Sequence, residues 1–225
     1  MNLFISLFNH PNEKRQREYF TCLKENCENP LIERVLIFYE GECGWSLPEK
    51  CQIIADYRPT YHDLFQLTSQ FPHDINIIAN SDIAFNGTLQ NADRVRPREC
   101  FAITRHEYKD GKVIDFTSNQ TAQPRWSQDV WIFRGFADIR DCDSALAENL
   151  QTNDYDRIKF WLGTPGCDNL IARRIMQSGY SLKNPYHDIV CLHHHEGEKR
   201  PDYSHRLTGV ARKWAGLQDV KPVRL

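Results

Sequence analysis

The sequence predicts an α/β domain with a mixed central sheet and helices on both faces. Three observations lead to this fold class. Strand, helix and strand patterns follow one another within the first 45 residues, which is typical of a βαβ unit with parallel strands. The apolar runs at 3–8, 33–41 and 74–80 have the composition of buried strands. Segments 99–108 and 127–135 alternate more, which indicates that the second half of the sheet is mixed.

The first half reads as alternating strands and helices. The run LFISLF is a strand stopped by NHPNE, and EKRQREYFTCLKENCE has aromatic and apolar residues among charges, as an amphipathic helix does. ERVLIFYEG is a second strand, closed by a glycine, and in the ambiguous stretch 42–57 KCQIIADY fits a further short strand. RPTYHDLFQLTSQF predicts a helix that begins at Pro59 or Thr60, and DINIIAN predicts the next strand.

The second half predicts strands over ECFAITRHEY and SQDVWIFRG, with a turn and a strand in KDGKVIDF between them. The polar stretch TSNQTAQPRW is expected to form a loop over the site, and CDNLIARRIMQSGY a helix that ends at Gly179. HDIVCLHHH is the last predicted strand. We expect one domain over residues 1–205 and a basic C-terminal tail, 206–225, packed on it.

The overall composition excludes several classes of protein. The chain has 225 residues, a formal net charge of −2 and 28 Lys and Arg against 30 Asp and Glu, so nucleic-acid binding is not expected. There is no apolar run long enough to span a membrane and no secretory leader, so a cytoplasmic protein with at most peripheral membrane contact is expected. The eight cysteines have irregular spacings, which predict reduced thiols and no structural zinc motif.

The stretch NIIANSDIAFNGTL places Asn80, Ser81 and Asp82 just after a buried strand. In parallel α/β sheets, ligands bind beyond the carboxyl ends of the strands. A carboxylate at that place suits a divalent cation that also binds substrate phosphates. The alternative, a plain turn or an Asx cap, fits the same residues equally well.

The motifs RPTYHDLF, ANSDIAF, SQDVWIFRG, PGCDN and a late H-x-H occur in an order that resembles the GT-A-type glycosyltransferases. The most similar group is the small glycosyltransferase domain of chlorella viruses and related bacterial proteins, and the resemblance covers roughly residues 1–205. It implies a single GT-A-like, Rossmann-like domain. Asn80 stands where the DxD motif of the family has its first aspartate.

The resemblance implies that Asp82 and a late histidine hold Mn²⁺ or Mg²⁺ across the two phosphates of a nucleotide-sugar. Because alternate side chains of a strand share a face, His193 and His195 point together and His194 points away. His193 is the preferred second ligand, followed by His195, and a polar strand end is the simpler interpretation of all three.

Two aspartates are candidates for the catalytic base. The resemblance favours Asp168, at the start of a predicted helix, although an N-cap has the same sequence pattern. A base at this position implies inversion at the anomeric carbon. Asp129 is the alternative base or an acceptor ligand, unless it is simply a surface acid at the end of a strand.

The remaining candidates surround the expected donor and acceptor sites. The candidates for binding the nucleotide-sugar donor are Asn9, Glu40, Arg58, Tyr61, Asn80, Ser81 and Arg200. Trp126 and Trp131 are candidates for stacking on acceptor sugars, or are core residues.

The predicted function is therefore metal-dependent transfer of a sugar from a nucleotide-sugar, with UDP expected from the resemblance, to a glycan or lipid-linked acceptor. The expected product is a surface polysaccharide or a glycoprotein glycan. Two alternatives remain: a catalytically silent nucleotide- or glycan-binding module, and a nucleotidyltransferase. The absence of glycine from LFNHPNEKR counts against the nucleotidyltransferase.

Overall fold

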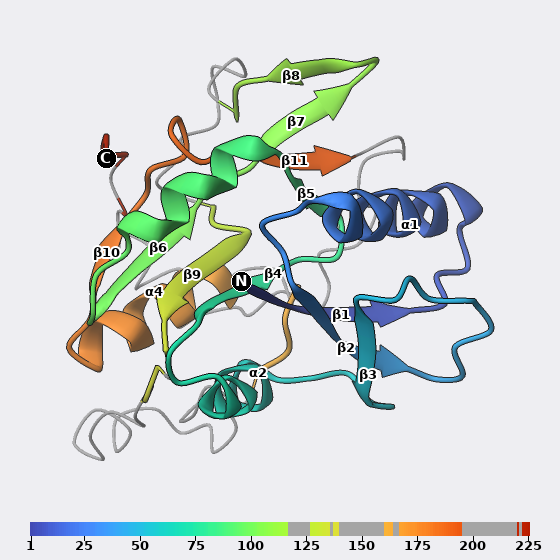
Figure 1. Cartoon of the computed structure of the whole chain (residues 1–225), viewed down its shortest axis with the longest axis horizontal. Coiled ribbons are helices and arrows are strands. Elements are labelled where there is room, and N and C mark those ends of the chain that lie inside the picture. Colours follow the sequence, from blue (N-terminus) through green and yellow to red (C-terminus); the bar gives the residue numbers. More distant parts are fainter. Residues whose placement is uncertain (117–126, 136, 140–159, 164–166, 195–219, 221) are drawn as a thin grey trace, which may run out of the picture.

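The structure is a computed structural model of the 225-residue chain. It describes residues 1–116, 127–135, 137–139, 160–163, 167–194, 220 and 222–225. Within these residues the chain folds as a mixed α/β structure, in which a large sheet lies between helices and a smaller sheet stands beside it (Figure 1). The predicted fold class, a mixed sheet with helices on both faces, is confirmed.

The large sheet has seven strands in the order β10-β6-β9-β4-β1-β2-β3. In chain order these are β1 (Asn2–Phe8), β2 (Arg34–Glu40), β3 (Cys51–Ala55), β4 (Ile75–Ala79), β6 (Glu99–Ile103), β9 (Val130–Arg134) and β10 (Ser181–Lys183). Strands β3, β2, β1 and β4 are parallel, and β9 is antiparallel to both β4 and β6. The switch in direction at β9 brings its first residue beside the last residues of β4 and β6, since Val130 pairs with Ala79 and Ile103.

The smaller sheet has four strands in the order β5-β11-β7-β8. They are β5 (Ile83–Phe85), β7 (His106–Lys109), β8 (Lys112–Ile114) and β11 (Cys191–His194). The hairpin β7–β8 turns at Asp110 and Gly111, which both have positive φ, and this matches the turn predicted in KDGKVIDF.

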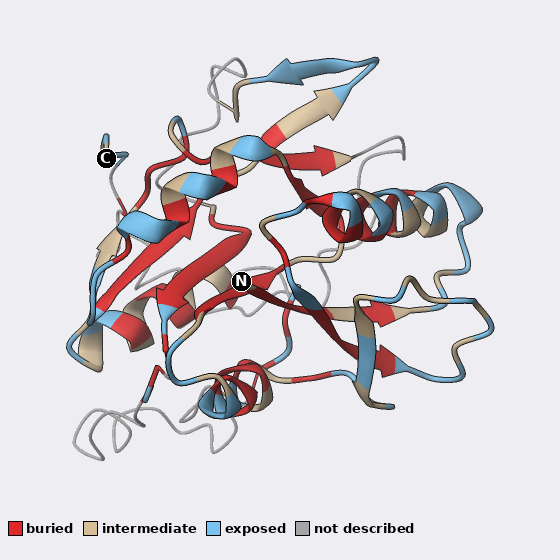
Figure 2. Cartoon of the chain, in the orientation of Figure 1, coloured by how far each residue is buried: buried red, intermediate tan, exposed pale blue. Residues whose placement is uncertain are grey.

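Two hydrophobic cores lie on opposite faces of the large sheet, because alternate residues of each buried strand point to opposite sides. Leu3, Ile5 and Leu7 of β1 belong to one core, while Phe4 belongs to the other. Figure 2 shows buried residues along the inner strands and exposed ones on β8. The helices are α1 (Glu13–Glu28) and the 3-10 helix η2 (Gly87–Arg94) on the first core, and α2 (Tyr61–Leu67), followed by the 3-10 turn η1 (Thr68–Gln70), with α4 (Cys167–Gln177) on the second.

Helix α2 begins where the sequence predicts. Thr60 is its N-cap and forms a capping box, in which the Thr60 side chain accepts from the Asp63 N–H while Asp63 accepts from the Thr60 N–H at 2.8 Å. The predicted strand 99–108 instead forms two strands in different sheets, β6 and β7. The chain leaves the first sheet at Thr104, whose N–H donates to Asn184 and whose hydroxyl donates to the Ser127 carbonyl.

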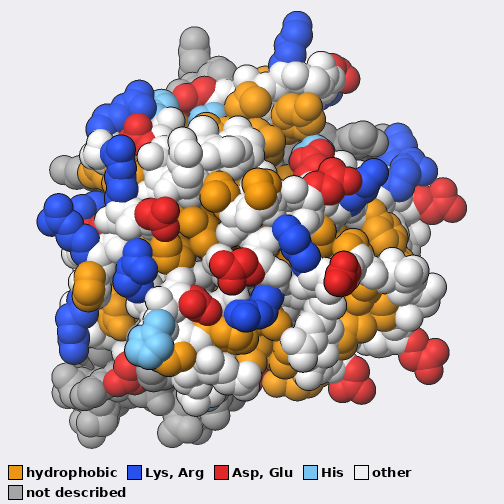
Figure 3. Space-filling view, viewed as in Figure 1, with side chains coloured by type: hydrophobic (Ala, Val, Ile, Leu, Met, Phe, Trp, Pro, Cys, Tyr) orange, Lys and Arg blue, Asp and Glu red, His pale blue; other side chains and the backbone are white. Residues whose placement is uncertain are grey.

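The last described residues lie on the domain. Val220 is buried in the second core, and the N–H of Val223 donates to the Asn184 carbonyl at 3.1 Å. Arg224 forms an ion pair with Asp188 at 3.1 Å. Figure 3 shows acidic and basic side chains mixed over much of the visible face, in keeping with the small net charge. Among the described residues, none of the helices combines the length and apolar character that crossing a membrane needs.

Candidate active site

The candidate site forms where β4, β6 and β9 meet. After β4, the Asn80 N–H donates to the Asp129 carbonyl at 3.1 Å and the Ile83 N–H donates to the Asn80 carbonyl at 3.2 Å. This turn carries the chain out of the large sheet and into β5 of the smaller one. It leaves Asn80, Ser81 and Asp82 between the two sheets, beyond the carboxyl end of a parallel strand.

Asp82 is buried, with 4% of its surface exposed, and its carboxylate has two cationic neighbours. Its Oδ2 accepts from Arg15 Nη2 at 2.9 Å and lies 3.2 Å from His193 Nε2. Burial by itself would raise the pKa of Asp82, but the hydrogen bond and charge of His193, followed by those of Arg15, hold that pKa well below its ordinary value. Asp82 is therefore ionised at any physiological pH.

His193 lies between two carboxylates. Its register on β11 places it opposite Ile83 on one side and Glu107 on the other, and its Nδ1 is 2.7 Å from Glu107 Oε2. Burial would lower the pKa of His193, but hydrogen bonds to Asp82 and Glu107 raise it to about 9. Against the effect of burial, His193 and then Arg105 lower the pKa of Glu107 to about 2. The imidazole is thus charged and locked in orientation by both acids.

Arg105 extends these contacts to Asp129. Its Nε donates to Glu107 Oε1 at 2.9 Å, and its Nη1 lies 3.0 Å from both Asp129 oxygens. Asn80 Nδ2 also donates to Asp129 Oδ1 at 3.0 Å. The Asp129 carboxylate is therefore surrounded by donors, in a position fixed by the start of β9 beside the end of β4.

Asp168 has a different environment from Asp129. It lies in the first turn of α4, where its carboxylate accepts from the N–H of Asn169 at 3.0 Å and of Gln128 at 3.4 Å. Burial, and then the negative charge of Asp129, raises the pKa of Asp168 to about 6 despite these backbone donors. A carboxylate with this pKa is ionised at neutral pH and able to accept a proton.

Asp82 and His193 together fit one divalent cation. Two neighbouring ligands of an octahedral ion with bonds of about 2.1 Å lie about 3.0 Å apart, and Asp82 Oδ2 and His193 Nε2 are 3.2 Å apart. Glu107 on the opposite nitrogen is the partner that metal-binding histidines usually have. Arg15 occupies the same oxygen of Asp82, and the charged imidazole carries a proton on Nε2, so a cation there requires this guanidinium to move and that proton to leave.

Several predicted donor-binding residues lie at the surface or hold the backbone. Asn9 and Glu40 are exposed at the ends of β1 and β2, and Asn9 Nδ2 donates to the Glu42 carbonyl at 3.0 Å. Ser81 donates to the Ser6 carbonyl, which ties the turn to β1. Arg58 is exposed, and its Nη2 donates to the Leu162 carbonyl at 3.1 Å.

Two aromatic residues do not have the surroundings expected of them. Tyr61 is 1% exposed and its hydroxyl lies 3.7 Å from Cys167 Sγ, inside the second core, so it does not line a donor pocket. Trp131 is 0% exposed, because the central position of β9 is covered on both faces, and its ring offers no surface to a sugar. Tyr61 is therefore a core residue and not a donor ligand, and of the two alternatives for Trp131 the structure favours the core residue. Trp126, His195 and Arg200 lie outside the described residues.

Sequence reasoning missed three charged residues of the site: Arg15, Arg105 and Glu107. Arg105 and Glu107 are two apart in TRHEY, and this spacing puts two side chains on one face of an extended segment. That signal was present in the sequence. Arg15 has no comparable signal, because its position in the first turns of α1 only becomes significant once α1 packs beside β5.

Comparison with known proteins gives likenesses in fold to solved structures. No family model matches the chain, and no curated protein matches it. One similar solved structure is the mannosyltransferase PcManGT from Pyrobaculum calidifontis in complex with GDP-Man and Mn²⁺, with 14% identity, a TM-score of 0.44 and coverage of 90% of this chain. This chain spans 58% of the length of that one. A second is the galactosyltransferase LgtC in complex with donor and acceptor sugar analogues, with 10% identity, a TM-score of 0.44 and coverage of 99% and 98% of the two chains.

These likenesses describe the arrangement of strands and helices only. No match at the level of sequence links the chain to chlorella-virus proteins.

Proposed function

We propose that this chain is a GT-A-type glycosyltransferase that moves a sugar from a nucleotide-sugar to an acceptor hydroxyl. The observation that carries the proposal is the contact between Asp82 and His193 at 3.2 Å, with Glu107 on the other nitrogen of the ring. Residues 111 positions apart meet there, as the motif ANSDIAF and the late H-x-H lead one to expect. The donor is expected to be UDP-linked, on the resemblance of the sequence motifs alone.

Asp82 and His193 would hold Mn²⁺ or Mg²⁺, which neutralises charge on the diphosphate as it leaves. Arg15 is the residue that must yield its contact with Asp82, and its guanidinium would then be available to bind a phosphate oxygen. His193 keeps its orientation through Glu107, which Arg105 holds in turn. These residues therefore bind and orient the leaving group and take no proton from the acceptor.

Asp168 is the proposed base, in preference to Asp129. Both oxygens of Asp129 contact Arg105, and Oδ1 also accepts from Asn80, so other side chains already occupy this carboxylate. Asp168 instead accepts from the backbone N–H groups of Asn169 and Gln128, and its pKa is raised to about 6. In the proposed step Asp168 takes the acceptor proton, the acceptor oxygen attacks the anomeric carbon, and the bond to the diphosphate oxygen breaks with its electron pair. One displacement of this kind inverts the configuration.

The test measures release of nucleoside diphosphate from a panel of UDP- and GDP-sugars, with Mn²⁺ or with EDTA. We expect slow metal-dependent hydrolysis without acceptor and its loss in Asp82→Ala, with Asp93→Ala, an exposed acid on η2, as the matched control. Binding of a nucleotide-sugar without any turnover would favour the silent binding module. Attack at phosphorus, seen as release of pyrophosphate from a nucleoside triphosphate, would favour the nucleotidyltransferase.

A further inference from the structure

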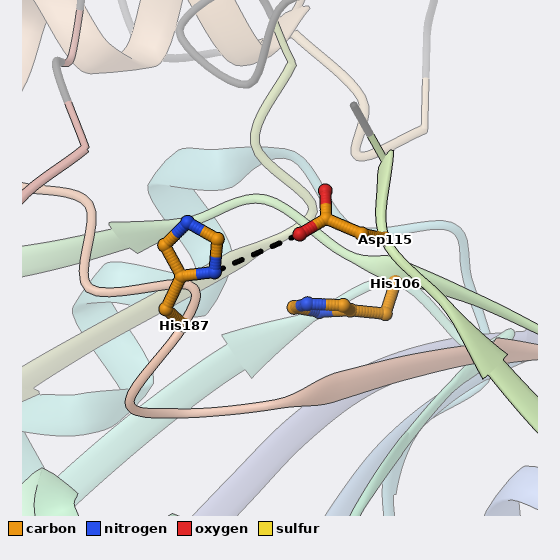
Figure 4. A group of neighbouring side chains, drawn as sticks. All are labelled: His106, Asp115 and His187. Carbon is orange, nitrogen blue, oxygen red and sulfur yellow. Dashed lines mark ion pairs between the residues drawn. The ribbon is translucent and has the colours of Figure 1, made fainter. Parts of the chain in front are cut away.

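A second group of possible metal ligands lies at the β7–β8 hairpin. His106, Asp115 and His187 converge there from three separate segments (Figure 4). One ligand atom from each of the three side chains lies within 4.8 Å of the other two, and His187 Nδ1 is 3.7 Å from Asp115 Oδ2. None of the three belongs to the network around Asp82.

The hairpin register explains why His106 and Asp115 meet. Glu107 pairs with Ile114 across the antiparallel strands, and continuing this register by one residue places His106 opposite Asp115. Directly opposed residues point to the same face, so their side chains are neighbours. Because faces alternate along β7, Glu107 points toward His193 while His106 points to the other side.

The buried ring nitrogen Nδ1 of His106 lacks a hydrogen-bond partner among the described residues. The residue as a whole is 6% exposed. Leaving a buried polar atom unpaired is unfavourable, so such atoms usually have a ligand or water beside them. Burial lowers the pKa of His106, which keeps the ring neutral and able to donate a lone pair.

The other two side chains leave one side of the group accessible. Asp115 and His187 are about one-third exposed, 36% and 35% for their side chains, so an ion from solvent can reach them. Ligands of a tetrahedral zinc ion with bonds of about 2.1 Å lie about 3.4 Å apart, which requires only small movements from the 3.7 Å observed between His187 and Asp115.

We propose that His106, Asp115 and His187 form a zinc site, with water in the fourth position. Two imidazoles and one carboxylate are a donor set typical of zinc, whereas Mg²⁺ and Ca²⁺ prefer oxygen ligands. The ion would bind the β7–β8 hairpin to the segment before β11. Glu107 lies on this hairpin and His193 on β11, which directly follows that segment, but the inference does not depend on the proposed activity.

The test is zinc binding by the full chain after treatment with EDTA and buffer exchange at pH 7.5. Competition with a chromophoric chelator gives the affinity and the number of sites for the wild type, His187→Ala and Asp115→Asn. We expect each variant to lose one equivalent of bound zinc, because its affinity at this site should fall more than about 100-fold. A residue that only hydrogen-bonds to a metal ligand would have a smaller effect. Zinc at about 100 times its Kd should raise the wild-type Tm by about 5–10 °C and leave the variants nearly unchanged.

Two controls locate the site. His73→Ala removes an exposed histidine outside the group and should bind zinc as the wild type does. Asp82→Asn should keep the equivalent that His187→Ala loses, which separates this site from the proposed catalytic one. Equal zinc stoichiometry and equal Tm gain in the wild type and both variants would overturn the proposal, as would loss of that equivalent in Asp82→Asn alone.

Discussion

Replacing Asp168 with asparagine distinguishes a catalytic base from a helix cap. The pKa of this carboxyl is raised from 3.8 to about 6, a difference of about two pKa units. At about 1.36 kcal/mol per unit, the ionised form costs the folded state about 3 kcal/mol at pH 7.5. Asparagine removes that cost. Its NH₂ group, however, cannot accept the weak hydrogen bond from the Gln128 N–H, and losing this bond destabilises the variant by about 1 kcal/mol.

The expected net effect of Asp168→Asn is a gain of about 1–2 kcal/mol at pH 7.5, or a rise in Tm of about 3–6 °C. The sign follows from proton binding: between pH 3.8 and about 6 the folded state binds more protons than the unfolded state, so wild-type stability falls as pH rises through this window. The advantage of the variant should therefore be small at pH 4, grow up to pH 6 and stay constant above it. Urea unfolding at pH 4.5 and 7.5 measures this difference.

The same variant should lose about 10²–10⁴-fold in transfer rate, the usual contribution of a general base. For the wild type, the rate should fall about tenfold per pH unit below pH 6, because the base becomes protonated. Asp63→Asn is the control, since Asp63 also lies in the first turn of a helix but serves the capping box of α2. A full transfer rate in Asp168→Asn, or an equal loss of stability at both pH values, would show that Asp168 only caps α4.

Three further predictions concern stability. Arg105→Lys should lower the free energy of unfolding by about 2 kcal/mol and the Tm by about 4–8 °C, because one ammonium cannot reach Glu107 and both Asp129 oxygens. An unchanged Tm would contradict this prediction. Gly135→Ala should lower the free energy of unfolding in urea by more than about 2 kcal/mol, because φ is +72° and the added Cβ would lie 2.6 Å from the Pro72 carbonyl oxygen. Gly44→Ala is the control and should be nearly neutral, because the Cβ added there meets nothing within 4 Å. The folded-state pKa of His193 is raised to about 9, so in EDTA its contribution to the free energy of unfolding is fully present below pH 6.5 and is lost as pH rises through 9. Urea unfolding of His193→Gln should not show this loss. An identical pH dependence in the variant and the wild type would refute the charged imidazole.

Much of the fold could be predicted because its signals are local. The strands at 2–8, 34–40 and 75–79 are short apolar runs between polar stops, and Thr60 with Asp63 is a capping box that can be read from four residues. The split of 99–108 into β6 and β7 could not be predicted in the same way. Side-chain alternation continues across the break, and the hydrogen bonds that end β6 come from Ser127 and Asn184, which are far away in the sequence.

The candidate site shows the same division between local and distant information. The alternation of strand faces predicts that His193 and His194 point apart, and they do: one contacts Asp82, while the other lies 3.0 Å from Glu25 of α1. The burial of Tyr61 depends on Phe160 and Cys167, which no local pattern connects to it. Residue type alone makes an aromatic or charged side chain a candidate, and only the packing decides whether it reaches a ligand.

Asn80 illustrates how a departure from a motif can have a structural reason. Its side-chain amide donates to Asp129 Oδ1 at 3.0 Å, and Arg105 lies on the same oxygen. An aspartate at position 80 would place a second carboxylate within hydrogen-bonding distance of Asp129, and both would compete for the single guanidinium. The amide instead serves as a donor and keeps the turn in place. With one carboxylate fewer to bind a cation, the proposed site depends more strongly on His193, whose position Glu107 and Arg105 determine.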